Sequence, residues 1–207
     1  MHQASQNFPS YFFSNNTSTL KKALKRGWIP IDYEPTTHED DPVLNNLDAK
    51  VYKVRPHLHP TLNRYEYIFF LDSKIRYNER ALVNFLTTRT EKAMFMIAHM
   101  SRTRPFLQNE FNESMNQERY AKQRDQILRF ISTHEDESTK EPDTFYQMSM
   151  ILRKNAHPNT KDIGELWHDM IRECGIQDQI SFYFVQQKFD HVIGVLPLYR
   201  IAAILQG

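Results

Sequence analysis

The fold of this chain is decided by residues 64–75, which read Arg-Tyr-Glu-Tyr-Ile-Phe-Phe-Leu-Asp-Ser-Lys-Ile. Within this stretch, residues 67–71 form an unbroken apolar and aromatic run that is too short for a globular helix. Such a run is typical of a strand that is buried on both faces inside an α/β sheet. Ligands of open α/β sheets collect at the carboxyl ends of strands, so Asp72 stands where chemistry is usually placed.

The residues that follow this run are compatible with phosphate binding. Asp72 and Lys74 point to the same side if the strand continues, because side chains alternate along a strand. A carboxylate beside a cation suits a metal-bound phosphate. An ordinary strand end with a solvated ion pair explains the same residues equally well, and this stretch alone leaves both interpretations open.

Length and composition favour one domain in a reducing compartment. The chain has 207 residues, and its 26 basic and 25 acidic residues create no overall field that would attract nucleic acid. The single cysteine, Cys174, excludes an internal disulfide framework. Residues 1–10 lack the apolar core of a signal peptide, and no apolar run is long enough to span a bilayer. We therefore expect a soluble, cytoplasmic protein.

Common nucleotide and metal motifs are absent from the sequence. The five glycines form neither GxGxxG nor GxxxxGK[ST], which excludes the common dinucleotide-binding and P-loop folds. None of the nine histidines has a metal-site spacing such as HExxH. His191, near the C-terminus, is the histidine that we expect as an additional metal ligand.

Hydrophobic patterns predict an alternation of strands and helices. Residues 50–55 alternate basic with apolar side chains, which places basic side chains spaced by two on one face. The apolar end, residues 192–205, indicates either a terminal element docked on the body or the N-terminal part of a longer polypeptide. We expect strands at residues 11–13, 28–31, 67–71, 93–99 and 146–152, loops at 34–46 and 134–143, and helices at 20–25 (capped by Thr17 or Ser18), 79–88, 109–132 and on both sides of Gly175 within 160–189.

Two blocks of the sequence resemble a plant and microbial glycosyltransferase-like family. Residues 49–57 (Ala-Lys-Val-Tyr-Lys-Val-Arg-Pro-His) with 65–74 are similar to its R-x-x-K-x-x-P-H … Y-x-x-x-x-x-x-D-x-x block. Leu166-Trp167 with residues 177–182 (Gln-Asp-Gln-Ile-Ser-Phe) resemble its L-W … R-D-Q-L-S-F block. The matched blocks cover roughly half of the chain in the right order. Further matches are His99, Arg102 and Glu110 near its H … R … E segment, and residues 11–15 with Gly27-Trp28 near its F-T-D-N … G-W element.

The resemblance implies a GT-A-like α/β fold: a single domain over residues 1–207 with a mixed central β-sheet flanked by helices. It also implies a UDP-sugar donor, a glycan or glycoprotein acceptor, and a divalent metal, Mn²⁺ or Mg²⁺, at a D-x-D-like motif on which Asp72 lies. Size and content further resemble the glycosyltransferase domain that large algal viruses encode for their capsid glycans, which implies the host cytoplasm. Three positions depart from the family, because Lys74 replaces its second aspartate and Lys50 and Gln177 replace arginines. The first strand and uridine-binding loop are also shortened.

The chemistry of a sugar-diphosphate donor gives these residues their expected roles. Asp72, with His191, is expected to hold the metal, and Asp178 is expected to deprotonate the acceptor hydroxyl in an inverting displacement. Each role has a structural alternative: Asp178 also suits the start of a helix, and a Trp in a helical apolar stripe is usually a core residue. The expected substrate-binding residues are Lys50, Lys53 and Arg55 for the diphosphate, Gln179 and Trp167 for the sugar, and Ser14, Asn15, Ser73 and Lys74 around the donor.

Two other function classes fit parts of the sequence. A metal-dependent nuclease with a D … (D/E)-x-K core would use Asp72 and Lys74, but the near-neutral charge and the lack of a basic stripe oppose it. A non-catalytic carbohydrate- or protein-binding module would keep the fold and lose the donor site. Lys74 and the shortened N-terminal element are compatible with that alternative.

Overall fold

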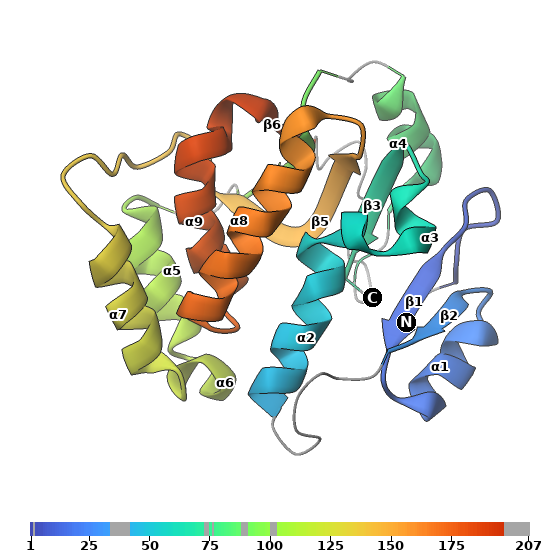
Figure 1. The fold of residues 1–207 in the computed structure, drawn as a ribbon, viewed down its shortest axis with the longest axis horizontal. Coiled ribbons are helices and arrows are strands. Elements are labelled where there is room, and N and C mark those ends of the chain that lie inside the picture. Colours follow the sequence, from blue (N-terminus) through green and yellow to red (C-terminus); the bar gives the residue numbers. More distant parts are fainter. Residues whose placement is uncertain are drawn as a thin grey trace.

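The computed structural model describes residues 1, 3–33, 42–72, 75, 77–87, 91–99 and 103–196. Figure 1 shows helices packed around a mixed β-sheet, with a smaller sheet at one side. The α/β class expected from the sequence is therefore confirmed. In this described part of the chain, no helix combines the length and the apolar character that a membrane span requires.

The larger sheet has four strands and is mixed. The strands lie in the order β3-β5-β4-β6; β5 is antiparallel to both neighbours, and β6 is parallel to β4. Three strands, β3, β4 and β6, thus run in one direction. Their carboxyl ends all lie at the same end of the sheet. The four strands are β3 (Tyr67–Leu71), β4 (Met94–Ala98), β5 (Tyr146–Lys154) and β6 (Ile193–Leu196).

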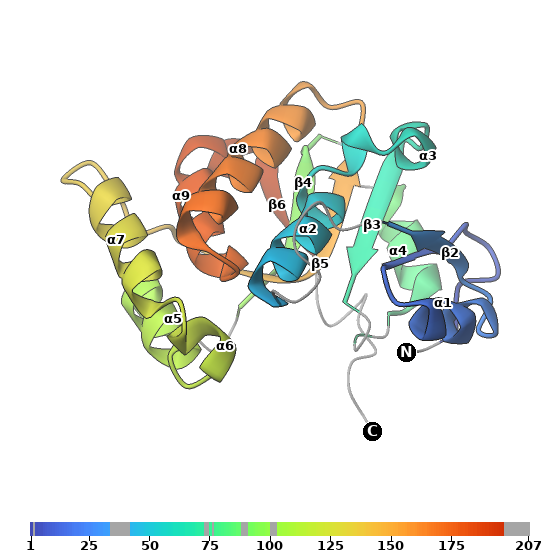
Figure 2. The same cartoon turned by 60° about the horizontal axis from the view of Figure 1, so that its bottom comes forward.

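The two faces of this sheet carry separate apolar cores, because successive side chains of a strand point to opposite faces. Ile151 belongs to the core that contains Val54 of α2 and Trp167 of α8. Leu152 belongs to the core that contains Leu82 of α4. Figure 2 shows α8 and α9 on one side of the sheet and α4 on the other. These helices are α2 (Pro42–Val54), α4 (Glu79–Leu86), α8 (Pro158–Cys174) and α9 (Asp178–Phe189).

The aromatic strand β3 lies at an edge of the sheet, not at its centre. Among the described strands it pairs only with β5. All five of its residues are half-buried, whereas the sequence predicted a strand buried on both faces. The position explains the difference, because the side of β3 that lacks a paired strand faces a cavity.

A small parallel sheet lies beside β3 (Figure 1). Its two strands are connected by α1, whose N-cap is Asn16, not Thr17 or Ser18: Asn16 Oδ1 accepts a hydrogen bond of 2.9 Å from the backbone N–H of Thr19. Gly27 follows α1 with φ of +81°, a left-handed conformation that favours glycine. The elements are β1 (Tyr11–Ser14), α1 (Thr17–Leu24) and β2 (Ile29–Asp32).

Residues 50–54 belong to helix α2 and not to an extended segment with alternating faces. Lys50 and Lys53 are three residues apart, so they share one side of the helix. The helix ends before Pro56, because the proline ring disfavours a helical conformation in the residue that precedes it. The loop predicted at 34–46 is therefore wrong for residues 42–46, and residues 34–41 lie outside the described part. Two short helices follow: η1 (Pro56–Leu58) and α3 (Pro60–Asn63).

The single helix predicted over residues 109–132 is in fact three helices, which form a layer beside α9 (Figure 2). No glycine or proline marks the breaks between them. Instead, Tyr120 is buried, and Gln123 Oε1 accepts a hydrogen bond of 3.0 Å from the backbone N–H of Ile176. Contacts distant in sequence therefore accompany these breaks. The helices are α5 (Phe106–Ser114), α6 (Glu118–Ala121) and α7 (Arg124–His134), and the short η2 (Asp190–Val192) precedes β6.

Candidate functional site

A cavity of about 720 Å³ lies between the N-terminal sheet, helix α2, strand β3 and helix α4. Its walls are largely apolar and aromatic, and its charged lining residues are Lys50, Lys53 and Asp72. A concave, mostly apolar site with a few convergent polar groups is the usual form of a small-molecule site. The aromatic lining residues are Phe8, Tyr11, Phe12, Phe13, Trp28, Tyr33, Tyr52, Tyr65, Tyr67, Phe69, Phe70 and Tyr77.

The aromatic wall is held in place by ring contacts between separate elements. Phe13 of β1 stacks on Tyr52 of α2, with ring centroids 4.6 Å apart and an interplanar angle of 25°. Tyr33, just after β2, packs against the same Tyr52 ring at 5.0 Å. These contacts bring the N-terminal sheet and α2 together and give the cavity flat apolar surfaces, which suit a nucleobase or the apolar face of a sugar.

The two lysines of α2 share one carboxylate. Lys50 Nζ and Lys53 Nζ each donate to Asp178 Oδ2 at 2.6 Å, and the side chains of Lys50, Lys53 and Asp178 are 16%, 8% and 7% exposed. Lys53 Nζ also lies 5.0 Å from the centre of the Phe70 ring. Both lysines line the cavity, whereas Asp178 is not among its lining residues. The ion pairs with Asp178, which does not line the cavity, therefore hold two ammonium groups at the cavity wall.

The electrostatics of this cluster follow from burial and pairing. Burial by itself would raise the pKa of Asp178, but the two ammonium groups outweigh it and hold that pKa well below its usual range. Burial lowers the pKa of Lys53, and the Asp178 carboxylate opposes this shift. The carboxylate of Asp178 is therefore charged at neutral pH.

Asp72 follows β3 directly, as the sequence indicated. Its backbone N–H donates to Ser149 O at 2.9 Å, which extends the pairing of β3 with β5 by one residue. The residue is exposed and lines the cavity, and its negative charge acts on Lys53. Asp72 thus lies at a strand end in a cavity, and its role as a metal ligand stays a prediction.

The donor set fits a metal that arrives with a ligand. Within the described residues, no group of three or more His, Cys, Asp or Glu side chains could hold a metal ion by itself. Mg²⁺ and similar ions are commonly held by one or two carboxylates together with substrate phosphates. Asp72 alone suits that arrangement, in which a phosphate ligand supplies the other oxygen atoms.

The geometry contradicts the expectation that His191 assists Asp72. Because β3 and β6 run in the same direction, Asp72 lies past the carboxyl end of β3 while His191 precedes the amino end of β6. Through the shared register, Ile193 lies level with Ile68, so the two candidate ligands are separated by about 20 Å along the strands. They cannot share one ion.

The structure favours the structural alternatives for Trp167 and Asp178. Trp167 is 0% exposed, and its Nε1–H lies 3.3 Å from Asp178 O and 3.2 Å from Ser181 Oγ. Its ring packs at 4.5 Å on Phe182, so it presents no face to a sugar. Asp178 starts α9, is buried and has a depressed pKa, so it lacks both the access and the basicity that a general base requires.

Four further predicted residues lie away from the cavity lining. Arg55 Nη1 lies 2.9 Å from His168 Nδ1, and Arg55 Nε lies 3.4 Å from Glu165 Oε2, both on α8. Gln179 Nε2 donates to Glu110 Oε2 at 3.2 Å. Ser14 and Asn15 follow the lining residue Phe13 without themselves lining the cavity. Ser73 and Lys74 lie outside the described residues, so their predicted roles are untested.

Sequence reasoning missed a buried polar cluster behind the cavity. Gln177 Nε2 donates to Glu110 Oε1 at 2.8 Å and also to Ser114 Oγ, which ties α5 to the start of α9. Arg153 of β5 is fully buried, with its guanidinium 6.0 Å from the Trp167 ring centre and no hydrogen-bond partner in the part of the chain that the structure describes. Burial lowers its pKa to about 9. The match of Gln177 and Glu110 to the family blocks pointed to this region.

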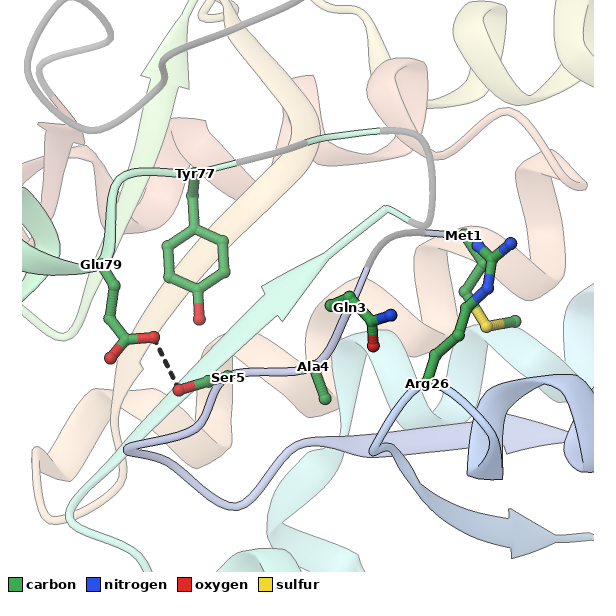
Figure 3. Close-up of a pocket in the computed structure, with 7 residues that line it drawn as sticks. All are labelled: Met1, Gln3, Ala4, Ser5, Arg26, Tyr77 and Glu79. Carbon is green, nitrogen blue, oxygen red and sulfur yellow. Dashed lines mark hydrogen bonds between the residues drawn. The ribbon is translucent and has the colours of Figure 1, made fainter.

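A second hollow of about 540 Å³ adjoins the cavity, since Met1 and Tyr77 line both. Figure 3 shows the residues of the N-terminal segment facing Tyr77 and Glu79 across this hollow. Ser5 Oγ donates to Glu79 Oε2 at 2.6 Å, which fastens the N-terminal segment to α4. The wall at this side of the cavity is therefore held by a contact between residues distant in sequence.

Comparisons with known proteins return one structural similarity. The chain is similar to the crystal structure of mouse xyloside xylosyltransferase 1 in its apo form, with a TM-score of 0.49 and 13% sequence identity over 88% of this chain and 69% of that chain. No family model matches, and no curated protein matches. A structural similarity at this level does not by itself assign an activity, and the expected link with algal-virus capsid glycans stays a prediction.

Proposed function

We propose that this chain is a metal-dependent glycosyltransferase that binds a UDP-sugar in the aromatic cavity and transfers the sugar to a glycan acceptor. The proposal is carried by one observation, namely that Lys50, Lys53 and Asp72 line a single cavity with aromatic walls. A nucleotide diphosphate requires these residue types: aromatic faces for its base, cations for its phosphates and a carboxylate for its divalent ion.

The two lysines act on the leaving group. Breaking the bond between sugar and diphosphate leaves negative charge on the diphosphate, and catalysis requires that this charge be stabilised most strongly in the transition state. An ammonium group has three N–H donors, so Lys50 and Lys53 keep donors beyond the one that each directs at Asp178. Asp72 would hold a divalent ion, which would offset the negative charge of the phosphates.

The aromatic wall binds and orients the rest of the donor. Phe13, Tyr33 and Tyr52 form a contiguous aromatic surface from three elements. A planar base or a sugar face that packs on this surface buries apolar area and displaces water from the diphosphate region. Water exclusion strengthens the attraction between the phosphates and the lysines, because charges interact more strongly in a medium of low dielectric constant.

A non-catalytic binding module is the second candidate. Asp72 is the one carboxylate among the described residues that line the cavity, and Asp178, the base expected from the sequence, is engaged by two lysines. If Asp72 holds the metal, the described cavity lining has no second carboxylate to deprotonate an acceptor hydroxyl in an inverting displacement. A module that has lost the donor site predicts no response to UDP.

Thermal unfolding with UDP and Mn²⁺ tests the proposal. A ligand that binds only the folded state stabilises it by about 2.7 kcal/mol at a concentration of 100 times Kd. For a protein of this size that corresponds to a rise in Tm of roughly 5–10 °C. We expect this rise in the wild-type protein and its loss in Asp72→Asn, because the variant cannot bind the ion that accompanies the phosphates.

The matched control is Asp125→Asn, which removes an equally charged, exposed side chain from α7, distant in sequence from the cavity. It is expected to keep the full response to UDP and Mn²⁺. A wild-type protein that responds to DNA and metal but not to UDP would instead support the nuclease. A response to neither would support the binding module, and both outcomes reject the transferase.

A further inference from the structure

The cluster of Lys50, Lys53 and Asp178 contains more positive than negative charge. Lys50 and Lys53 bring two ammonium groups to one oxygen of Asp178, so the three residues together carry an excess of one positive charge. The charge of Asp72 acts on Lys53, and the charge of Asp178 acts on the side chains of Tyr120 and Cys174. The excess charge is reachable from the cavity, because both lysines line it.

The arrangement of the three side chains is directional. Asp178 approaches the ammonium groups from the start of α9 and is not among the lining residues, whereas the lysines reach the cavity from α2. Each ammonium group has two N–H donors that are not directed at Asp178. An anion in the cavity would therefore meet donors from two lysines while the carboxylate stays on their far side.

Two ammonium groups so close together require a counter-ion. Both lie 2.6 Å from the same oxygen atom, and Lys53 is almost fully buried. Without a nearby anion, like charges repel and a buried ammonium group loses its hydration, so the lysine would give up its proton or turn away. Asp178 supplies the anion that keeps both side chains charged and in place.

We propose that Asp178 is a positioning residue: a fixed buried counter-ion that keeps Lys50 and Lys53 charged and directed into the cavity, where they bind the diphosphate of the ligand. This inference rests on the proposed function for the identity of the ligand, and on the contacts of Asp178 for its mechanism. It replaces the catalytic base that the sequence led us to expect at this position. The two roles predict different effects, because a base acts on turnover and a counter-ion acts on the binding of phosphates.

Calorimetric titration of Asp178→Asn with inorganic pyrophosphate and Mn²⁺, and separately with uridine, tests the inference. We expect pyrophosphate to bind the variant at least about tenfold more weakly than the wild type, the loss typical of one charge-assisted hydrogen bond. Uridine binding is expected to be unchanged, because it carries no phosphate. Unchanged or tighter pyrophosphate binding would overturn the inference, since it would mean that Asp178 merely competes with the ligand for the lysines.

A second variant keeps the test decisive if Asp178→Asn does not fold. The double variant Asp178→Asn/Lys53→Met removes the most buried ammonium group together with its counter-ion, so the ammonium group that loses its partner is that of Lys50, whose side chain is the more exposed of the two at 16%. It is expected to fold and to bind pyrophosphate at least about tenfold more weakly than the wild type. Wild-type affinity in this double variant would overturn the inference, because Lys50 alone would then suffice.

Single lysine variants separate this inference from the proposed function. Lys50→Met is expected to weaken pyrophosphate binding, while Lys122→Met, on an exposed lysine of the α6 region, is expected to leave it unchanged. Wild-type protein that binds pyrophosphate but not UDP would reject the proposed function and leave the lysine site standing. Wild-type protein that does not bind pyrophosphate would overturn the inference itself.

Discussion

Two carboxylates at the ends of regular elements have opposite surroundings. Asp72, at the carboxyl end of β3, is exposed and lines a cavity. Asp178, at the start of α9, is 5% exposed and accepts hydrogen bonds from two lysines. The local sequence presents both as plausible catalytic groups, and the structure separates them by access.

The comparison indicates that the role of a charged group depends on whether it can exchange its present partners for a ligand. An exposed carboxylate exchanges water for a metal or a ligand at little cost to stability. A buried carboxylate that is paired with cations cannot be removed without leaving those cations uncompensated. Asp72, after β3, is therefore suited to contact a ligand. Asp178, at the start of α9, holds Lys50 and Lys53 in position.

The largest expected effect is on the stability of Asp178→Ala. Breaking a buried ion pair by removing one partner typically costs about 3–5 kcal/mol, and here two ammonium groups lose their shared partner. Asp72→Ala, which removes an exposed carboxylate whose charge acts on Lys53, is expected to cost at most about 1 kcal/mol. Urea unfolding of the two variants measures both values. Equal losses of stability would contradict the distinction between the buried Asp178 and the exposed Asp72.

The next effect concerns the packing that places the lysines. A Cβ atom at Gly164 of α8 would lie 2.6 Å from the carbonyl oxygen of Val54, at the end of α2. Gly164→Ala gains about 1 kcal/mol of helix propensity. Overpacking against a backbone atom typically costs about 1–3 kcal/mol, so we expect a net loss of up to about 2 kcal/mol.

The same substitution should also weaken the binding of UDP, because it pushes apart the two helices that place Lys53. The control is Lys161→Ala, an exposed position on α8 that is expected to change neither stability nor binding. Urea unfolding and calorimetric titration of both variants measure the two effects. If Gly164→Ala lost stability and kept wild-type affinity, the position of α2 would not control the lysine pair.

The sequence predicted the framework because its local signals agree with the long-range packing. The aromatic run at 67–71 forms a strand, and Gly175 separates α8 from α9 with φ of +99°, a conformation that glycine favours. The predicted first-turn position of Asp178 in its helix is likewise observed. In these segments, periodicity and helix end signals point to a single structure.

The site was harder to predict because its local signals are ambiguous. Within residues 50–55, Lys53 and Arg55 fit a strand period of two, whereas Lys50 and Lys53, three residues apart, fit one side of a helix. The pairing of Asp178 with these lysines joins residues 125 and 128 positions apart in the chain. The separation of Asp72 from His191 depends on strand order, which a single sequence does not encode locally.

Acid sensitivity gives a smaller effect that also distinguishes the two carboxylates. Because the pKa of Asp178 is lower in the folded than in the unfolded state, its contribution to stability is complete above the unfolded-state pKa of about 3.9. It is lost as the pH falls below that value towards the folded-state pKa. The slope is at most about 1.4 kcal/mol per pH unit for one proton.

Urea unfolding at pH 5, 4 and 3 measures this slope. Asp178→Asn is expected to lose less stability than the wild type over this range, because it lacks the group that must be protonated. Asp72→Asn serves as the comparison and is expected to keep the wild-type slope. The same acid slope in Asp178→Asn as in the wild type would show that the ion pairs do not depress this pKa.

The smallest expected effect concerns α4, on the face of the sheet opposite α2 and α8. Asn78 caps α4, since its Oδ1 accepts a hydrogen bond of 3.0 Å from the backbone N–H of Ala81. Asn78→Ala is expected to cost about 1 kcal/mol in urea unfolding, with Arg80→Ala at an exposed position of α4 as the control. Although Leu82 and Leu86 of α4 line the cavity, α4 packs on the face of the sheet opposite α2 and α8, so this loss is expected to weaken UDP binding less than Gly164→Ala does. Weaker UDP binding in Asn78→Ala, as large as that in Gly164→Ala, would mean that both faces of the sheet position the site and that the lysine side has no special control over it.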